Sequence, residues 1–265
     1  MAEPSRAGRS TVTRADISGA LRAVGLTRRS VVFMHSSLSA LGYVEGGADA
    51  VVDALLDVVG AEGLASVPTH TWGIVNARQP VFHVELTPSH VGKVTEVFRH
   101  RPGAVRSRHP THSVAAIGRG AEGFVADHEH SSTPAGRKTP YGRLCALGGQ
   151  VLLLGVGLGS WTLMHAFEEW APVPWLFDRW ESLYTVLEDG RTIAVPSQRH
   201  TADPGCRRDY PALEPLLQRH GLIRYGSLGP ARIRAIDAAG AERLLVPRMR
   251  AEPDLVLSRR TRPVV

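Results

Sequence analysis

The 265-residue chain has only two cysteines, Cys145 and Cys206, and few aromatic residues. Two cysteines exclude a disulfide-built framework, and a chain of this length buries enough apolar surface to fold without one. Phe, Trp and Tyr make up 6% of the sequence, too little for the stacking platforms of single-strand nucleic-acid binders. Apolar runs such as residues 151–154 fall far short of the ~18 residues that a membrane-spanning helix needs.

The remaining composition is typical of a globular domain, with 43% hydrophobic and 21% charged residues. The first twelve residues contain no apolar stretch of the kind found in secretory signals. We therefore predict a disordered tail at residues 1–12, one domain at 13–265 and a cytoplasmic location. The net charge of +6 favours anionic ligands in general. Because the basic residues are dispersed and no recognised motif is present, we predict neither nucleic acid nor a membrane as a partner.

Hydrophobic periodicity predicts alternating helices and strands. The expected helices lie at residues 13–25, 48–59, 87–98 and 210–220. The expected buried strands lie at residues 31–34, 64–67, 113–117 and 151–154. Residues 69–87 show no periodicity and are expected to form a loop, and Asp189-Gly190 predicts a hairpin turn. This order predicts an α/β fold, a single domain in which helices flank a mixed central sheet.

A glycine-rich turn after the most apolar strand carries the strongest candidate site. Residues 155–159 contain three glycines, and a helix with His165 and Glu168 follows. Residues three apart share a helix face, so the carboxylate can orient the imidazole as a general base. A core histidine beside a surface glutamate explains the same pair without catalysis. The dinucleotide fingerprint and the His-Glu-x-x-His zinc motif are both incomplete here.

Polar loops at other strand ends supply further candidates, although each also fits an ordinary solvated loop. Small residues after the strand at 31–34 can turn backbone N–H groups toward an anion. The segment 106–113 brings guanidinium, hydroxyl and imidazole groups to the entrance of a strand. Trp72 and Tyr141 offer walls for a flat or sugar-like ligand.

Taken in order, these segments resemble the aminoglycoside 3-N-acetyltransferase family, the antibiotic N-acetyltransferases. The segments that carry the resemblance are 35–38, 68–72, 106–113, 139–142 and 153–168. The resemblance covers about residues 14–257. It implies a mixed α/β fold unlike that of the GNAT acetyltransferases, acetyl-CoA as the donor and no metal. It also implies an amine acceptor, for which the 3-amino group of a 2-deoxystreptamine aminoglycoside is the first candidate. Acetylation of such an antibiotic would imply a role in antibiotic resistance.

The resemblance also assigns roles to residues. His165 matches the catalytic base and Glu168 its acidic partner. The coenzyme contacts expected from it are His35, Ser36, Ser37, Leu38, Thr71, Ser107 and Ser113. We expect Ser113 or Thr71 to stabilise the oxyanion. For the acceptor, an aromatic and carboxylate wall is expected from Trp72, Tyr141, Glu169, Asp178 and Asp209.

Alternatives remain open on the sequence alone. A family member can acetylate an amine that is not an aminoglycoside. A zinc-dependent hydrolase would use His109, His112 and His165. A non-enzymatic module that binds anions or nucleic acid would exploit the positive charge. The assembly is expected to be a monomer or a homodimer.

Overall fold

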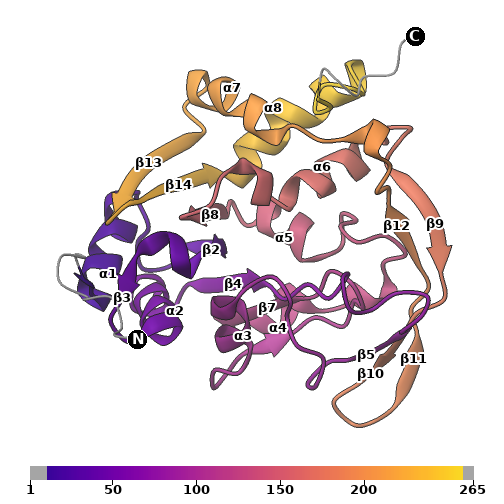
Figure 1. The fold of residues 1–265 in the computed structure, drawn as a ribbon, viewed down its shortest axis with the longest axis horizontal. Coiled ribbons are helices and arrows are strands. Elements are labelled where there is room, and N and C mark those ends of the chain that lie inside the picture. Colours follow the sequence, from indigo (N-terminus) through magenta and orange to yellow (C-terminus); the bar gives the residue numbers. More distant parts are fainter. Residues whose placement is uncertain (1–10, 259–265) are drawn as a thin grey trace, which may run out of the picture.

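A seven-stranded mixed sheet forms the centre of the computed structural model, which describes residues 11–258 (Figure 1). In sheet order the strands are β13 (Ile223–Leu228), β14 (Ala231–Asp237), β8 (Gln150–Leu154), β2 (Val31–Ser36), β4 (Leu64–Pro68), β7 (Val114–Gly118) and β6 (Val105–Arg106). Strand β2 runs parallel to both β4 and β8, and the other neighbours are antiparallel. The predicted mixed α/β architecture is confirmed.

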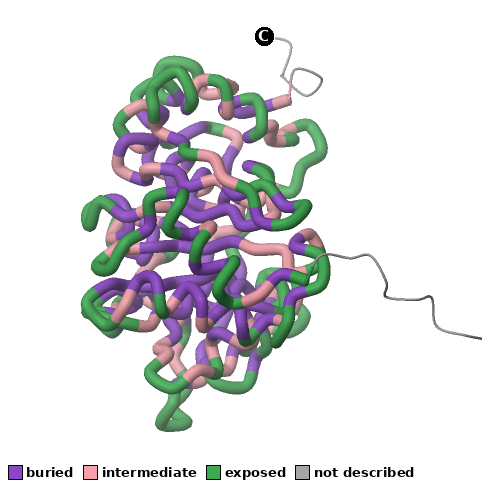
Figure 2. Tube along the Cα trace, turned by 90° about the vertical axis from the view of Figure 1, so that its left-hand side faces the viewer, coloured by how far each residue is buried: buried purple, intermediate pink, exposed green. Residues whose placement is uncertain are grey.

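Helices cover both faces of this sheet. One face packs on α1 (Arg14–Ala23), α2 (Gly47–Val59) and α3 (Lys93–Arg99). The other packs on α4 (Ala121–Val125), α5 (Pro140–Ala146), α6 (Leu163–Trp170), α7 (Glu214–Arg219) and α8 (Ala238–Ala251). Alternate side chains of β8 pack on the two faces of the sheet and so stabilise both helical layers. Leu152 and Leu154 belong to one apolar cluster, whereas Val151 and Leu153 belong to the other. Figure 2 shows the buried residues inside and the exposed ones around them.

Three smaller ladders complete the fold. Strands β5 (Val81–His83), β10 (Tyr184–Val186) and β11 (Thr192–Ala194) form one of them. The second joins β9 (Phe177–Glu181) to β12 (Ser197–His200), and the third joins β1 (Thr11–Val12) to β3 (Tyr43–Val44). The hairpin predicted at Gly190 is confirmed by the antiparallel pairing of β10 with β11. The expected loop at 69–87 contains β5, because that segment pairs with β10 far away in sequence.

The ends of several predicted elements shift. The helix predicted from residue 13 begins with a capping box at Thr13 and Asp16, in which each side chain accepts a hydrogen bond from the other residue's backbone N–H. Of the predicted tail, residues 1–10 lie outside the described residues, and 11–12 form β1.

Two of the predicted helices begin later than expected. Residues 87–92 are not helical, because Thr87 closes a turn with His83 through its hydroxyl and its N–H, and α3 begins at Lys93. The helix expected at 210–220 starts as a 3-10 turn, and α7 begins at Glu214. Pro215, near the start of α7, has no N–H to donate back to that turn.

One edge of the central sheet gathers the sequence motifs. The parallel strands β2, β4 and β8 all end at this edge, and the antiparallel strand β7 begins there. Loops at the carboxyl ends of parallel strands commonly bind ligands in α/β folds. The segments that follow Ser36, Pro68 and Leu154, together with the loop before Val114, therefore meet in space. Within residues 11–258, no helix is long and apolar enough to cross a bilayer.

Candidate active site

A cavity of about 490 Å³ opens at this edge of the sheet. Its wall includes His35, near the end of β2, and residues that follow the other two parallel strands, namely His70 after β4 and His165 on α6 after β8. The ladder of β9 and β12 and the loop behind it supply the other side of the wall through Arg199, His200 and Arg208. Sequence segments more than 160 residues apart thus share one cavity.

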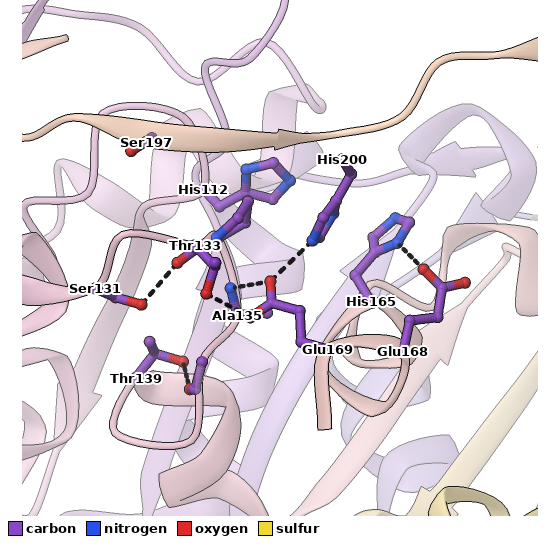
Figure 3. Close-up of polar contacts among 12 residues, drawn as sticks. His112, Ser131, Thr133, Ala135, Thr139, His165, Glu168, Glu169, Ser197 and His200 are labelled. Atoms are coloured by element: carbon purple, nitrogen blue, oxygen red, sulfur yellow. Dashed lines mark hydrogen bonds and ion pairs between the residues drawn. The ribbon is translucent and has the colours of Figure 1, made fainter. Parts of the chain in front are cut away.

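The predicted pair of His165 and Glu168 lies at this cavity (Figure 3). Both residues belong to α6, and His165 Nδ1 is 3.2 Å from Glu168 Oε2. The His165 side chain is 24% exposed and lines the cavity, whereas the Glu168 side chain is fully buried beneath it. The contact expected from the three-residue spacing is therefore present.

Two further residues hold the charge of Glu168. The Tyr210 hydroxyl donates to Oε1 at 2.6 Å, and the Arg208 guanidinium lies 3.3 Å from both carboxylate oxygens. Burial acts to raise the pKa of Glu168, but the hydrogen bond and charge of His165, together with Arg208 and Tyr210, lower it to about 2. The ionised carboxylate accepts the Nδ1 proton of His165. In the neutral imidazole this leaves Nε2 as the free lone pair.

A second imidazole–carboxyl pair stands beside the first (Figure 3). Glu169 Oε1 lies 2.8 Å from Nε2 of His200, and the ring centroids of His200 and His165 are 4.9 Å apart. Glu169, expected to touch the acceptor, instead lies buried behind His200, where it also binds Thr133 and Ala135. Burial raises the pKa of Glu169 to about 7, although the bonds from Thr133 and Ala135 act to lower it.

The other cavity histidines form a polar wall. Burial lowers the pKa of His35 to about 3. Burial and the neighbouring histidines also hold the pKa of His70 well below its ordinary value. His70 Nε2 lies 2.8 Å from the Tyr141 hydroxyl, and His35 Nε2 lies 3.3 Å from the Thr162 hydroxyl. These imidazoles are therefore neutral near pH 7 and offer hydrogen bonds without charge.

The predicted coenzyme turn lies between two cavities. A second cavity of about 630 Å³ is lined by Ser36, Ser37 and Leu38, and it shares Ser36 and Val91 with the first. His35 lines the first cavity only. The second cavity is also lined by Lys93, at the start of α3, which belongs to none of the sequence motifs.

Three of the expected coenzyme contacts are placed elsewhere. Thr71, Ser107 and Ser113 are buried and line neither cavity. Ser113 donates its hydroxyl to Thr69 O and accepts from Arg106, while Ser107 contacts His128 and accepts from Val114 N.

The Thr71 hydroxyl donates to the carbonyl of Pro110. These three side chains brace the loop that leads into β7. Their roles as coenzyme contacts, and the stabilisation of the oxyanion by Ser113 or Thr71, stay predictions, since neither cavity reaches these side chains.

Of the five expected acceptor contacts, only Trp72 lines the cavity, and its side chain is 48% exposed. Tyr141 is buried behind His70. Asp178 is exposed on β9 and pairs with Arg179, and Asp209 precedes the turn at Tyr210. Among the described residues that line the cavity there is no carboxylate, because Glu168 and Glu169 are buried behind their imidazoles.

The zinc ligands considered from the sequence do not converge. His109 is fully buried, stacks on His128, and has Nδ1 near the backbone N–H groups of Thr111 and His112. Within the part of the chain that the structure describes, no group of three or more His, Cys, Asp or Glu side chains is arranged to hold a metal ion.

A mixed α/β sheet with a cavity at the carboxyl ends of its parallel strands defines a ligand-binding α/β protein. The aminoglycoside 3-N-acetyltransferase family matches residues 33–250, so the chain belongs to this family. The chain is 39% identical over 180 residues to aminoglycoside N(3)-acetyltransferase VII of Streptomyces paromomycinus, and 38% identical over 179 residues to aminoglycoside N(3)-acetyltransferase IX of Micromonospora chalcea. The matches cover 62% and 61% of this chain and span only 62% and 63% of the relatives' length.

Solved structures agree with this assignment. Aminoglycoside acetyltransferase AAC(3)-Xa superposes with a TM-score of 0.78 at 33% identity, covering 91% of this chain and 93% of that one. A mutant of AAC(3)-IVa in complex with a gentamicin gives a TM-score of 0.82 at 27% identity, covering 96% and 94%. AAC-IIIb in a binary complex with CoASH gives 0.78 at 25% identity, covering 91% and 97%. The resemblance inferred from the sequence is confirmed.

Proposed function

We propose that this protein is an acetyl-CoA-dependent N-acetyltransferase in which His165, oriented by Glu168, is the general base. The observation that carries the proposal is the free Nε2 of His165 at the cavity, above a buried and ionised carboxylate. Family membership supports acetyl transfer as the reaction class. The CoASH complex of AAC-IIIb supports the donor.

The chemistry is a direct transfer in a ternary complex. An amine attacks the thioester carbonyl carbon as His165 Nε2 takes a proton from its nitrogen. The C–N bond forms, the C–S bond breaks, and its electron pair goes to sulfur. Glu168 stabilises the imidazolium that results, because its negative charge lies 3.2 Å from Nδ1.

The coenzyme would use both cavities. The turn at Ser36, Ser37 and Leu38 and the ammonium group of Lys93 suit the anionic diphosphate end in the second cavity. The thioester end then enters the first cavity past Ser36, toward His165. The shared wall residues Ser36 and Val91 support this path.

The 3-amino group of a 2-deoxystreptamine aminoglycoside is the acceptor that the named relatives support. The exposed ring of Trp72 suits the apolar face of a sugar. Another amine is the second candidate, because Arg199 and Arg208 line the cavity whereas carboxylates that would attract a polycation do not.

The test compares His165→Ala with His220→Ala, a histidine exposed at the end of α7. Thiol release is followed with acetyl-CoA and a panel of 2-deoxystreptamine antibiotics and simple amines. We expect kcat of the His165 variant to fall by about two to four orders of magnitude. CoA binding by calorimetry should be unchanged, and the control variant should be unaffected. Turnover by His165→Ala at the wild-type rate would contradict the assignment of His165 as the base. Acetylation of simple amines alone would show that the acceptor is not an aminoglycoside.

A further inference from the structure

An ammonium group must lose two protons before it becomes an amide, and His165 accounts for one of them. The balanced reaction is RNH₃⁺ + acetyl-S-CoA → RNH-acetyl + CoA-SH + H⁺. We propose that His200, oriented by Glu169, is a second base, which takes the proton that converts the bound ammonium into the free amine. This inference rests on the proposed N-acetyltransferase function and adds a catalytic residue to it.

Geometry places the second pair at the reacting centre. Glu168 and Glu169 are consecutive residues of α6, and each contacts a different imidazole (Figure 3). The rings of His165 and His200 are 4.9 Å apart and tilted by 40°, and both residues line the same cavity. A nitrogen in contact with one imidazole is therefore within a few ångströms of the other.

Hydrogen bonding around Glu169 fixes which nitrogen of His200 is free. The Thr133 hydroxyl donates to Oε2 at 2.6 Å, and the Ala135 N–H donates to Oε1 at 2.8 Å. Oε1 also faces His200 Nε2 at 2.8 Å, and three donors satisfy a carboxylate when Nε2 carries the proton. His200 Nδ1 then bears a lone pair. Among the described residues Nδ1 has no hydrogen-bond partner, although the side chain is only 8% exposed.

A buried unpartnered acceptor costs free energy unless a ligand satisfies it. An ammonium group bound in the cavity would supply the missing donor. Nδ1 is itself shielded in the structure, so the His200 ring must turn slightly toward the cavity before Nδ1 can contact the ammonium and receive that proton.

The pair of His200 and Glu169 can hold the proton as two neutral groups. When a proton reaches Nδ1, the Nε2 proton passes to Glu169, and the pair becomes a neutral carboxyl group beside a neutral imidazole. Burial raises the pKa of Glu169 to about 7, and burial with the charge of His165 lowers that of His200, so a buried imidazolium is avoided. The titratable or charged groups of the described residues that face the pair are His109, His112, Tyr141, His165, Glu168, Arg199 and Arg208.

Both protons are then accounted for. The first goes from the ammonium to the pair of His200 and Glu169. The second goes to His165 as the C–N bond forms. The departing sulfur takes one proton, and the other is released to water, which restores both pairs.

The kinetic test uses pH, because solution itself removes the first proton above the pKa of the amine, about 8 to 10 for aliphatic amines. Values of kcat/KM with acetyl-CoA and the aminoglycoside sisomicin are measured from pH 6.5 to 9.5 for wild type, His200→Gln, Glu169→Gln and His165→Gln. We expect His200→Gln to lose about 100-fold at pH 6.5 and to come within about threefold of wild type at pH 9.5. His165→Gln should stay low at every pH. A loss that is constant across pH, or no loss, would overturn the proposal.

Glu169→Gln is the conservative variant. Its amide oxygen can accept from Ala135 and His200 while its amide nitrogen donates to Thr133, so the imidazole keeps its orientation. The amide cannot take up the proton. We expect a loss at pH 6.5 of about tenfold that disappears at pH 9.5. A rate equal to wild type at pH 6.5 would show that Glu169 only positions the ring and would overturn the relay.

A readout without turnover separates this inference from the proposed function. Nitrogen-15 NMR of histidine-labelled protein reports which ring nitrogen of His200 is protonated, assigned with His200→Gln. We expect Nε2–H at pH 8 and Nδ1–H at pH 6 in wild type, and Nε2–H at both values in Glu169→Gln. An imidazolium, or one unchanged tautomer in wild type, would overturn the inference. Absence of turnover on every amine would overturn the proposed function, and the NMR result would still decide the proton chemistry of the pair.

Discussion

The negative charge at the bottom of the cavity belongs to a residue that water does not reach. Glu168 is fully buried, and three groups compensate its charge: His165, Arg208 and Tyr210. His165 lies on α6, whereas Arg208 and Tyr210 come from one segment about 40 residues further along the chain. Removing any of them takes at least one donor from a buried carboxylate, which costs more than the same change at a surface position.

We predict that Tyr210→Phe lowers stability by about 1.5–3 kcal/mol, the value of a hydrogen bond to a charged group. The pKa of Glu168 should rise from about 2, because one of the groups that lower it is lost. Urea unfolding at pH 7 measures the first effect. Tyr184→Phe, the same change on the exposed strand β10, is the control and should be neutral. Equal stability of both variants would contradict the assigned role of Tyr210.

Sequence patterns predicted the pair His165 and Glu168 because both lie on one helical turn. They carried no signal for His200, Arg208 or Tyr210, since these residues reach the pair from about 35 to 45 positions further along the chain. The carboxylates expected to contact the acceptor, those of Glu169, Asp178 and Asp209, do not line the cavity for the same reason. Residue type is visible in a sequence, but the tertiary fold decides which side of an imidazole a carboxylate occupies.

At the scale of elements, the turn between β8 and α6 positions the whole site. Gly155 has φ +71°, and a Cβ atom there would lie 3.0 Å from Ala40 Cβ and 3.3 Å from Ser37 O. Any larger residue would be strained and would push against the turn at Ser37 and Ala40, where the coenzyme is proposed to bind. Gly157, two residues on, has open space around it and an ordinary φ of −95°.

Gly155→Ala should therefore lower stability by about 1–2 kcal/mol, the cost of left-handed backbone for a non-glycine residue. It should also raise KM for acetyl-CoA about tenfold, which corresponds to about 1.4 kcal/mol of binding. Gly157→Ala is the matched control in the same turn. Thermal unfolding and initial-rate kinetics check both effects, and similar behaviour of the two variants would show that the turn is not tight at Gly155.

Element positions were predictable where one residue pattern dominated, as in β2, β4 and β8. They were less predictable where side chains build local turns. Thr87-Pro88 matches the start of a helix, yet the Thr87 hydroxyl accepts a hydrogen bond from the N–H of His83, and the helix begins only at Lys93. Strand β5 could not be predicted from its own sequence, because its pairing partner lies about 100 residues away.

For the molecule as a whole, buried histidines set the response to acid. Burial lowers the pKa of His35 to about 3 and that of His128 to about 4. The pKa values of four others also lie well below the ordinary value: His70, His109, His112 and His200. Below pH 6.5 the unfolded chain takes up protons that the folded chain refuses. Stability is therefore lost as pH falls from 6.5 toward 4.

Each such histidine contributes up to about 1.4 kcal/mol per pH unit in this range. Glu169 acts in the opposite sense, because its raised pKa favours the folded protein at low pH, but it is one group against six. We predict a steep fall in the urea midpoint between pH 7 and pH 5. His128→Gln should reduce the slope of the unfolding free energy against pH by the contribution of one proton, up to about 1.4 kcal/mol per pH unit. A midpoint that is flat over this range would contradict neutral interior imidazoles.

The ladder of β9 and β12 has an evolutionary consequence. Within residues 11–258 it pairs with no strand of the central sheet, yet it carries Arg199 and His200 to the wall that faces His165. Under the proposed function, sequence drift in this ladder changes acceptor preference as long as His200 is kept. Exchanging residues 197–199 between relatives, with His200 unchanged, is therefore a route to altering that preference.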